Sequence, residues 1–277
     1  MTDHASPPQT SRTFLFVPGN RPDRYGKALA AGADMVIFDL EDAVAIEDKE
    51  RARVDVVAAV SRAVVPVMVR VNARGTSWHT DDVVAVVAAG AHVMLPKAEA
   101  PEDVENMGLG PNSRQSVVVL IETPTGLMNA AALASTPAVA RLAFGSLDFA
   151  TALGVDPEHR EALLWARSQL VVASAAAGLT GPVDGVTRAV QDEAVLRSDI
   201  EHAKGLGFAG KLCIHPAQLA LTRALLDPSE EEVAWARRVL EVVGVESAGG
   251  VMALDGLMVD APVVKRAHSI IDSVRGK

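Results

Sequence analysis

Residues 35–71 read MVIFDLEDAVAIEDKERARVDVVAAVSRAVVPVMVRV, and this stretch decides the fold. Its two ends, residues 35–39 and 67–71, are short and almost continuously apolar, which is the pattern of strands buried on both faces. Residues 49–62, between them, are Ala-rich and amphipathic, as expected of a helix. A strand, a helix and a second strand in this order predict two parallel strands joined by a crossover helix.

The same unit recurs about eight times from Thr13 onward. Strands are predicted at residues 13–17, 35–39, 67–71, 92–95, 117–121, 140–144, 179–183 and 210–214. Helices are predicted at residues 24–31, 49–62, 81–89, 125–134, 157–177 and 192–205. Eight such units close a (β/α)₈ TIM barrel of about 250 residues. A doubly wound open sheet would show a similar alternation, and the strand count favours the closed barrel.

The two ends of the chain do not repeat this unit. Residues 1–12 are polar and contain two adjacent prolines, so they are predicted to form a disordered tail. Residues 13–227 are predicted to form the barrel as one domain, because no low-complexity linker divides them. Residues 228–277 open with an acidic helix start, SEEE at 229–232, and are predicted to form a C-terminal helical extension.

Composition excludes several classes of protein. The chain has 35 Asp and Glu against 26 Lys and Arg, a formal net charge of −9, so nucleic-acid binding is not expected. The longest apolar runs, residues 54–60 and 83–91, fall well short of the ~20 residues of a membrane helix, so no membrane span is expected. No secretory signal is recognised at the beginning. Cys213 is the only cysteine, which excludes an internal disulfide and favours a reducing, cytoplasmic setting.

Polar residues follow the predicted strands at their carboxyl ends, where catalytic groups of a barrel lie. They include Asp39, Glu41, Asp42, Arg70, Lys97, Glu122, Asp148 and His215. Five of these are carboxylates, and gathering so many in one cleft is unfavourable without a cation. The oxygen ligands favour Mg²⁺ or Mn²⁺ over zinc, with Glu122 and Asp148 as direct ligands. The three acids after the second strand are predicted to orient metal-bound water. For any single acid, the alternative is an ion pair with Arg70 or Lys97.

Arg70 is the predicted anchor for a substrate carboxylate, because a planar guanidinium matches two carboxylate oxygens. A metal beside it would chelate an α-keto or α-hydroxy acid. The two features together favour chemistry on a small oxo-acid such as pyruvate, glyoxylate or oxaloacetate, with the metal stabilising developing negative charge.

Eight motifs occur in a fixed order along the chain. They are FVPGNRPDR (16–24), VIFDLEDAV (36–44), VRVN (69–72), MLPKAE (94–99), IETPTG (121–126), FGSLDFATALG (144–154), CIHPAQ (213–218) and GLMVDAP (256–262). In this order they resemble the HpcH/HpaI aldolase and citrate lyase superfamily, in its citrate lyase β-subunit-like branch. The resemblance implies a Mg²⁺-dependent carbon–carbon lyase that acts on a β-hydroxyacyl-CoA such as citramalyl-, malyl- or citryl-CoA. Its products would be acetyl-CoA and an oxo-acid.

The resemblance also implies roles for individual residues. The metal ligands map onto Glu122, which also touches the substrate, and Asp148. The arginine for the oxo-acid carboxylate maps onto Arg70, and the catalytic acidic pair maps onto Glu41 and Asp42.

Residues 228–277 are implied to reach a neighbouring subunit. In related malyl-CoA lyases, an aspartate of the C-terminal motif acts there as general acid/base, and Asp260 occupies that position in this sequence. The resemblance therefore implies a shared site in a homotrimer or hexamer.

The thioester half is expected at the mouth of the barrel. Arg21, Arg24 and Lys27 follow the first strand and are predicted to meet the phosphates of CoA, and a solvated helix start is the alternative. His215 either assists thioester binding or makes a hydrogen bond at the barrel rim. Lys97 is expected to act electrostatically, since the carboxylate cluster argues against a Schiff base.

One position departs from the family pattern. Many relatives have an acid directly before the metal-binding aspartate, whereas this chain has Leu147 before Asp148. The substrate of the citrate lyase subunits is therefore not assigned to this chain by resemblance alone. Two other functions stay open: a CoA-independent class II pyruvate aldolase, and a citrate lyase β subunit that acts only in a complex with an acyl carrier protein.

Overall fold

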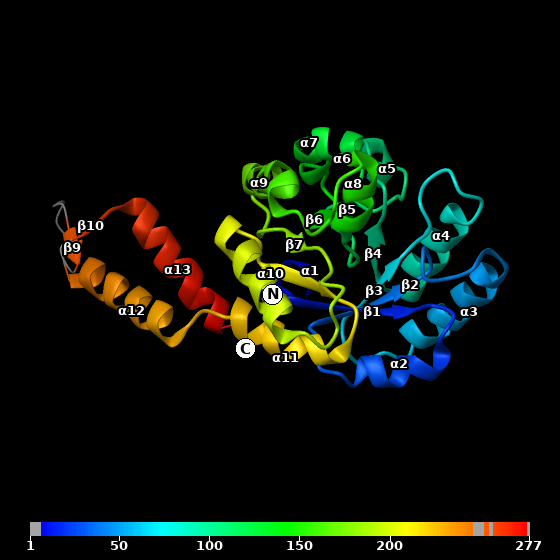
Figure 1. Cartoon of the computed structure of the whole chain (residues 1–277), viewed down its shortest axis with the longest axis horizontal. Coiled ribbons are helices and arrows are strands. Elements are labelled where there is room, and N and C mark those ends of the chain that lie inside the picture. The colour runs from blue at the N-terminus through cyan, green and yellow to red at the C-terminus, as the bar shows by residue number, and fades with distance from the viewer. Residues whose placement is uncertain (1–6, 246–251, 255–256, 276–277) are drawn as a thin grey trace. The chain divides into compact units, whose positions relative to one another are not determined.

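Eight parallel strands form a closed barrel in the computed structural model, which describes residues 7–245, 252–254 and 257–275 (Figure 1). The strands are β1 (Thr13–Pro18), β2 (Met35–Asp39), β3 (Val67–Arg70), β4 (His92–Leu95), β5 (Val117–Ile121), β6 (Val139–Phe144), β7 (Val183–Asp184) and β8 (Gly210–Cys213). Leu15 of β1 lies opposite both Val36 of β2 and Cys213 of β8, which closes the barrel. The predicted (β/α)₈ barrel is confirmed.

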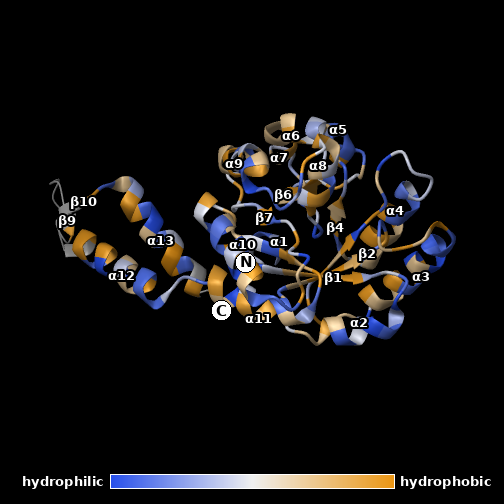
Figure 2. Ribbon diagram, viewed as in Figure 1, coloured by the Kyte–Doolittle hydropathy of each residue, from blue (hydrophilic) through white to orange (hydrophobic). Residues whose placement is uncertain are grey.

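Helices follow the strands along the chain. They are α1 (Pro7–Thr10), α2 (Pro22–Leu29), α3 (Lys49–Val60), α4 (His79–Ala89), α5 (Pro101–Glu105), α6 (Pro124–Met128), α7 (Ala130–Ala134), α8 (Ser146–Leu153), α9 (Arg160–Ala176), α10 (Glu193–Leu206) and α11 (Leu219–Leu226), with 3₁₀ turns η1 (Ile46–Asp48) and η2 (Pro216–Gln218). Figure 2 shows that the barrel strands are mainly apolar and that many helices combine apolar and polar residues. Among the described residues, none of the helices has the length and apolarity to cross a bilayer.

Alternate side chains of the strands fill the barrel interior. This interior cluster consists of Phe14, Met35, Ile37, Met68, Met94, Val118, Leu120, Ala143, Val183 and Leu212, all buried. The intervening residues, such as Leu15, Val36 and Phe38, belong to a second cluster shared with the surrounding helices. Both faces of the strands are therefore covered, which explains their nearly continuous apolar sequence.

Residues 7–12 are part of the folded structure, whereas the sequence predicts a disordered tail for residues 1–12. Residues 1–6 of this tail lie outside the described residues. Residues 7–10 form α1, and the buried guanidinium of Arg141 donates hydrogen bonds to the carbonyl oxygens of Pro8 and Ser11. A buried guanidinium needs hydrogen-bond acceptors, and this segment supplies two of them. Residues 7–12 are therefore part of the folded barrel.

Strand β7 differs from the prediction of residues 179–183. It contains only Val183–Asp184, and the preceding residues 179–182 are not in a strand. Pro182 has no N–H to donate to a neighbouring strand. Gly181 passes close to another segment, since a Cβ there would lie 2.3 Å from the carbonyl oxygen of Gly207. Because of Gly181 and Pro182, β7 begins at Val183 and not at residue 179, where the apolar run begins.

Residues 224–277 form a second compact unit, close to the predicted extension of residues 228–277. Its elements are α12 (Glu230–Val245), β9 (Met252–Leu254), β10 (Leu257–Val259) and α13 (Ala261–Arg275). The two short strands pair antiparallel, and the two helices pack on each other. Their core contains Ala236, Val239, Ala267 and Ile271.

Candidate active site

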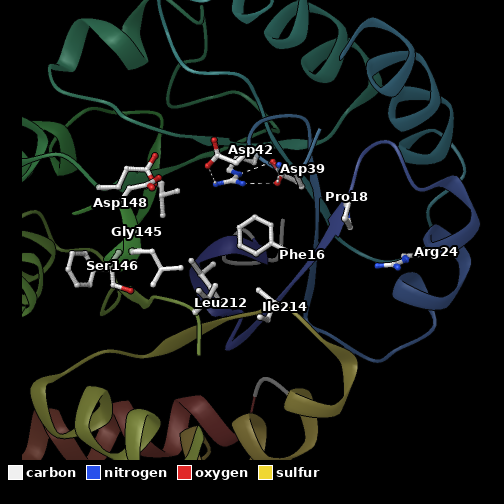
Figure 3. Close-up of a pocket in the computed structure, with 17 residues that line it drawn as sticks. Phe16, Pro18, Arg24, Asp39, Asp42, Gly145, Ser146, Asp148, Leu212 and Ile214 are labelled. Carbon is white, nitrogen blue, oxygen red and sulfur yellow. Dashed lines mark hydrogen bonds and ion pairs between the residues drawn. The ribbon is translucent and has the colours of Figure 1, made fainter. Parts of the chain in front are cut away.

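A pocket of about 350 Å³ lies at the carboxyl ends of the barrel strands (Figure 3). Its charged lining includes Asp39, Asp42, Arg70, Glu122 and Asp148. Its apolar lining includes Phe16, Leu120, Phe144, Leu147, Val186, Leu212 and Ile214. The structure thus brings together, in one cavity, charged residues that the sequence analysis placed at the ends of different strands.

Arg70 lies at the centre of the charged side. Its Nε and Nη2 donate to the two carboxylate oxygens of Asp39 over 2.8 and 2.6 Å. Its Nη1 lies 3.2 Å from Glu41 Oε2 and 3.5 Å from Asp42 Oδ2. Burial lowers the pKa of Arg70, but these carboxylates raise it overall, so the guanidinium stays charged. Asp39 occupies the fork predicted for a substrate carboxylate, and Nη1 faces Glu41 and Asp42, so a ligand carboxylate would have to replace one of these contacts.

The loop after β2 is held by a buried lysine that sequence reasoning missed. Lys49, at the start of α3, donates from Nζ to the carbonyl oxygens of Leu40 and Glu41 over 2.9 and 2.7 Å. The carboxylate of Asp39 also accepts the backbone N–H groups of Glu41 and Ala43. A single lysine within a charged run carries no recognisable signal, so only the tertiary structure identifies this role.

Lys97 connects two of the acids. Its Nζ donates to Glu41 Oε1 over 2.6 Å, and its backbone N–H donates to Glu122 Oε1 over 3.0 Å. Its φ of 53° is the only positive φ among the described non-glycine residues, a conformation that costs about 1–2 kcal/mol. Burial lowers the pKa of Lys97, but the bond to Glu41 raises it to about 12. A charged ammonium fits an electrostatic role and disfavours a Schiff base.

Glu122 follows β5 and is only 3% exposed. Burial and the negative charges of Glu41 and Asp148 raise the pKa of Glu122 to about 9. At neutral pH this carboxyl therefore requires a proton or a cation. Gly145 permits its close packing, because a Cβ there would lie 2.4 Å from Glu122 Cβ and 2.5 Å from Oε2. The glycine of the sequence motif FGSLD is thus required by the position of Glu122.

The charges of the pocket fit a divalent cation. Asp148, in the first turn of α8, points into the pocket (Figure 3). The site gathers five carboxylates, whereas Arg70 and Lys97 are the cations that pair with them. Within the described part of the chain, no three His, Cys, Asp or Glu side chains are arranged to bind one ion together. Mg²⁺ commonly binds through one or two carboxylates and water, so Glu122 and Asp148 are a suitable pair.

The basic residues predicted to meet CoA lie at the beginning of α2 and within it. Arg21 forms a two-nitrogen ion pair with Asp23 over 2.9 and 2.7 Å, and Lys27 is exposed on α2. Arg24, also exposed, is the one of the three that lines the pocket (Figure 3). Arg24 is therefore the member of this group that belongs to the pocket with the carboxylates.

Two other predicted site residues cap helical segments. His215 Nδ1 accepts the backbone N–H of Ala217 at the beginning of η2, which corresponds to the rim role. Asp260 is exposed, and its Oδ1 accepts the N–H of Val263 over 3.1 Å at the beginning of α13. Asp260 belongs to the unit of residues 224–277 and not to the barrel.

Metal binding is expected to strengthen as the pH rises. Below a pKa of about 9, Glu122 holds a proton that a cation must displace. The affinity for Mg²⁺ should therefore increase by up to about tenfold per pH unit between about pH 6.5 and 8.5, with release of about one proton per ion. Calorimetry in buffers of different ionisation enthalpy measures both quantities. A constant affinity without proton release would contradict this role of Glu122.

A (β/α)₈ barrel with an acidic, metal-competent pocket at the carboxyl ends of its strands defines a barrel enzyme. A profile of the HpcH/HpaI aldolase/citrate lyase family matches residues 12–216. The chain therefore belongs to the HpcH/HpaI aldolase/citrate lyase family and is a lyase of its citrate lyase β-subunit-like branch.

Individual relatives match nearly the whole chain. It is 34% identical to a citrate lyase subunit beta-like protein of Deinococcus radiodurans, over 96% of this chain and 98% of the relative. It is 36% identical to the (3S)-malyl-CoA thioesterase of Cereibacter sphaeroides, over 90% and 89%. The crystal structure of CitE from Mycobacterium tuberculosis in complex with magnesium, acetoacetate and coenzyme A matches with a TM-score of 0.80 and 34% identity, over 96% and 98%.

Proposed function

We propose that the protein cleaves a β-hydroxyacyl-CoA into acetyl-CoA and a small oxo-acid, or catalyses the reverse condensation, with Mg²⁺ bound by Glu122 and Asp148. The observation that carries the proposal is that Glu122 and Asp148 line the same pocket as Arg70, and that this pocket has more negative than positive groups. The similarity to CitE, whose structure contains magnesium, acetoacetate and coenzyme A, supports both the metal and the thioester.

The residues of the pocket suit this reaction. Bound magnesium would stabilise the negative charge that develops on the oxo-acid oxygen. Arg70 would bind the acid carboxylate through its Nη1 edge, in place of a present contact of Nη1 with Glu41 or Asp42, while Asp39 keeps the guanidinium in place through two hydrogen bonds. Glu41 and Asp42 lie beside this edge and would orient water around the cation.

The CoA half would bind at the rim. Arg24 lines the pocket from α2, and Arg21 and Lys27 of the same segment would add positive charge for the phosphates. His215, which caps η2 just after β8, would assist in binding the thioester from this position. Stabilisation of the protein by CoA, measured as a rise in Tm, would support this assignment, and it would be absent for a CoA-independent aldolase.

Asp260 is inferred to act as general acid/base in a neighbouring subunit of a homotrimer or hexamer. The variants Asp260→Ala and Arg70→Met should each be inactive alone. Subunits of the two variants, refolded together, should regain part of the activity, because some sites then combine a native Arg70 with a native Asp260. The double variant mixed with Arg70→Met serves as the control and should stay inactive. Full activity of Asp260→Ala alone would refute the role.

The reaction itself is tested with purified protein and a panel of malyl-, citramalyl- and citryl-CoA, with Mg²⁺ or with EDTA. Metal-dependent release of glyoxylate, pyruvate or oxaloacetate is the expected result. If no thioester is cleaved but an oxo-acid still binds, the reaction is that of a CoA-independent aldolase or of a citrate lyase β subunit that needs an acyl carrier protein.

Thioester hydrolysis is a second candidate, because one relative is a (3S)-malyl-CoA thioesterase. The same panel distinguishes the two reactions by their products. The lyase releases acetyl-CoA with an oxo-acid, whereas the thioesterase releases free CoA thiol with the intact hydroxy acid.

A further inference from the structure

We infer that the acid half of the substrate carries one carboxylate and an uncharged, apolar substituent. This inference rests on the proposed function and narrows its substrate class. The pocket has two chemically different sides (Figure 3). The side with Asp39, Asp42 and Arg70 is charged, and in the same view Leu212 and Ile214 lie away from it. Phe16 lies between the two sides, with its ring centroid 5.1 Å from the Arg70 guanidinium.

Much of the apolar side is built on the strands, which carry Phe16, Leu120, Phe144 and Leu212, and this part is therefore rigid. Leu120 and Leu212 are 2% and 3% exposed and belong to the cluster that fills the barrel interior. Phe16 and Val186 pack against that cluster from the pocket side. Side chains fixed in this way cannot turn aside to admit a hydrated, charged group.

The cations that line the pocket leave no obvious partner for a second carboxylate. Among its described lining residues, these cations are Arg24 and Arg70. Arg70 already faces three acids, and both of its terminal nitrogens are engaged by them. Arg24 is exposed and lies on α2, on the opposite side of the pocket from Asp148 (Figure 3). A second carboxylate on the acid would lie either against the apolar side chains or against like charges, and both placements are unfavourable.

Leu147 has a particular position in this wall. It precedes Asp148 in the first turn of α8, so it lies directly beside a metal-ligand candidate. It lines both this pocket and a neighbouring cavity of about 220 Å³. In that second cavity, the half-buried Arg167 and the buried Lys211 are both paired with Asp184. Leu147 therefore contributes to the partition that keeps the apolar side of the pocket away from those charges.

The test compares two acids of the same length in the full-length protein with saturating Mg²⁺. 2-Oxobutyrate ends in a methyl group where oxaloacetate ends in a carboxylate. We expect 2-oxobutyrate to bind at least about tenfold more tightly in calorimetry, and citramalyl-CoA to be cleaved with a higher kcat/KM than citryl-CoA.

Two variants of Leu147 provide a second test and its control. Leu147→Lys should shift the preference towards oxaloacetate by introducing a cation into the apolar wall, whereas Leu147→Met should preserve the wild-type order. Equal or tighter binding of oxaloacetate by the wild-type protein would overturn the inference and leave the lyase function intact. Binding of neither acid would overturn the inference and the proposed function together.

Discussion

Replacing Glu122 by alanine is expected to lower the metal-dependent rate by about a thousandfold or more, and Asp148→Ala should have a similar effect. Both carboxylates line the same pocket, and Glu122 is almost fully buried among negative charges. A cation at this position offsets their repulsion and supplies the charge that the reaction needs. Steady-state kinetics with a Mg²⁺ titration measure the loss. An unchanged rate would refute the metal assignment.

Glu122→Gln separates catalysis from folding. Because the pKa of Glu122 is raised to about 9, the carboxyl is protonated at neutral pH without metal, and glutamine resembles that form. The variant should therefore fold with nearly wild-type stability in EDTA, yet it should lose the stabilisation by Mg²⁺. Glu99→Gln is the matched control, because Glu99 does not line the pocket. It should keep both the rate and the response to Mg²⁺.

Replacing Arg70 by methionine should damage stability and activity together. The guanidinium pairs with Asp39, Glu41 and Asp42, and the first two are buried. Removal of one partner of a buried ion pair costs about 3–5 kcal/mol, because the other charge is left without compensation. Denaturant unfolding should show a decrease of this order in the free energy of unfolding. Binding of the oxo-acid should also be lost.

A second substitution tests the physical reason. In the double variant Arg70→Met/Asp39→Leu, one of the unpaired carboxylates is replaced by an apolar group. Much of the lost stability should return, whereas the activity should not, since no guanidinium is left to bind the acid. The stability and the activity of Arg70→Lys should lie between those of the wild-type protein and of Arg70→Met, because lysine keeps the charge but cannot make the two parallel hydrogen bonds. A stable, inactive Arg70→Met variant would show that the ion pairs do not stabilise the fold.

Local sequence predicted most of the barrel because burial on both faces has a direct signature. β2 (Met35–Asp39), β4 (His92–Leu95) and β5 (Val117–Ile121) have the predicted bounds, and they are apolar apart from Asp39 at the end of β2 and His92 at the start of β4. The structure differs from the prediction where contacts between residues far apart in the sequence determine the local conformation. Residues 7–12 are ordered through hydrogen bonds to Arg141, more than a hundred residues away, and no local pattern carries that information.

The positions of the candidate site residues could be predicted, but their pairing could not. The place of Arg70 at the end of a strand indicated a role at the mouth. Its engagement by Asp39, 31 residues earlier, depends on two neighbouring strands in parallel register, with Asp39 opposite Arg70. The link between Lys97 and Glu41 spans 56 residues and requires a positive φ that sequence does not reveal.

By itself, then, the sequence determined the repeated unit, the closure of eight strands, the family, and the residue types gathered at one end of the barrel. These follow from local periodicity and from the rule that parallel strands place their carboxyl ends together. Only the tertiary structure decided which charges pair, that Lys49 holds the acidic loop, and that Glu122 fits because residue 145 is glycine. The physical reason is that pKa values and ion pairs depend on burial and on distances of a few ångströms between strands, which composition and spacing do not specify.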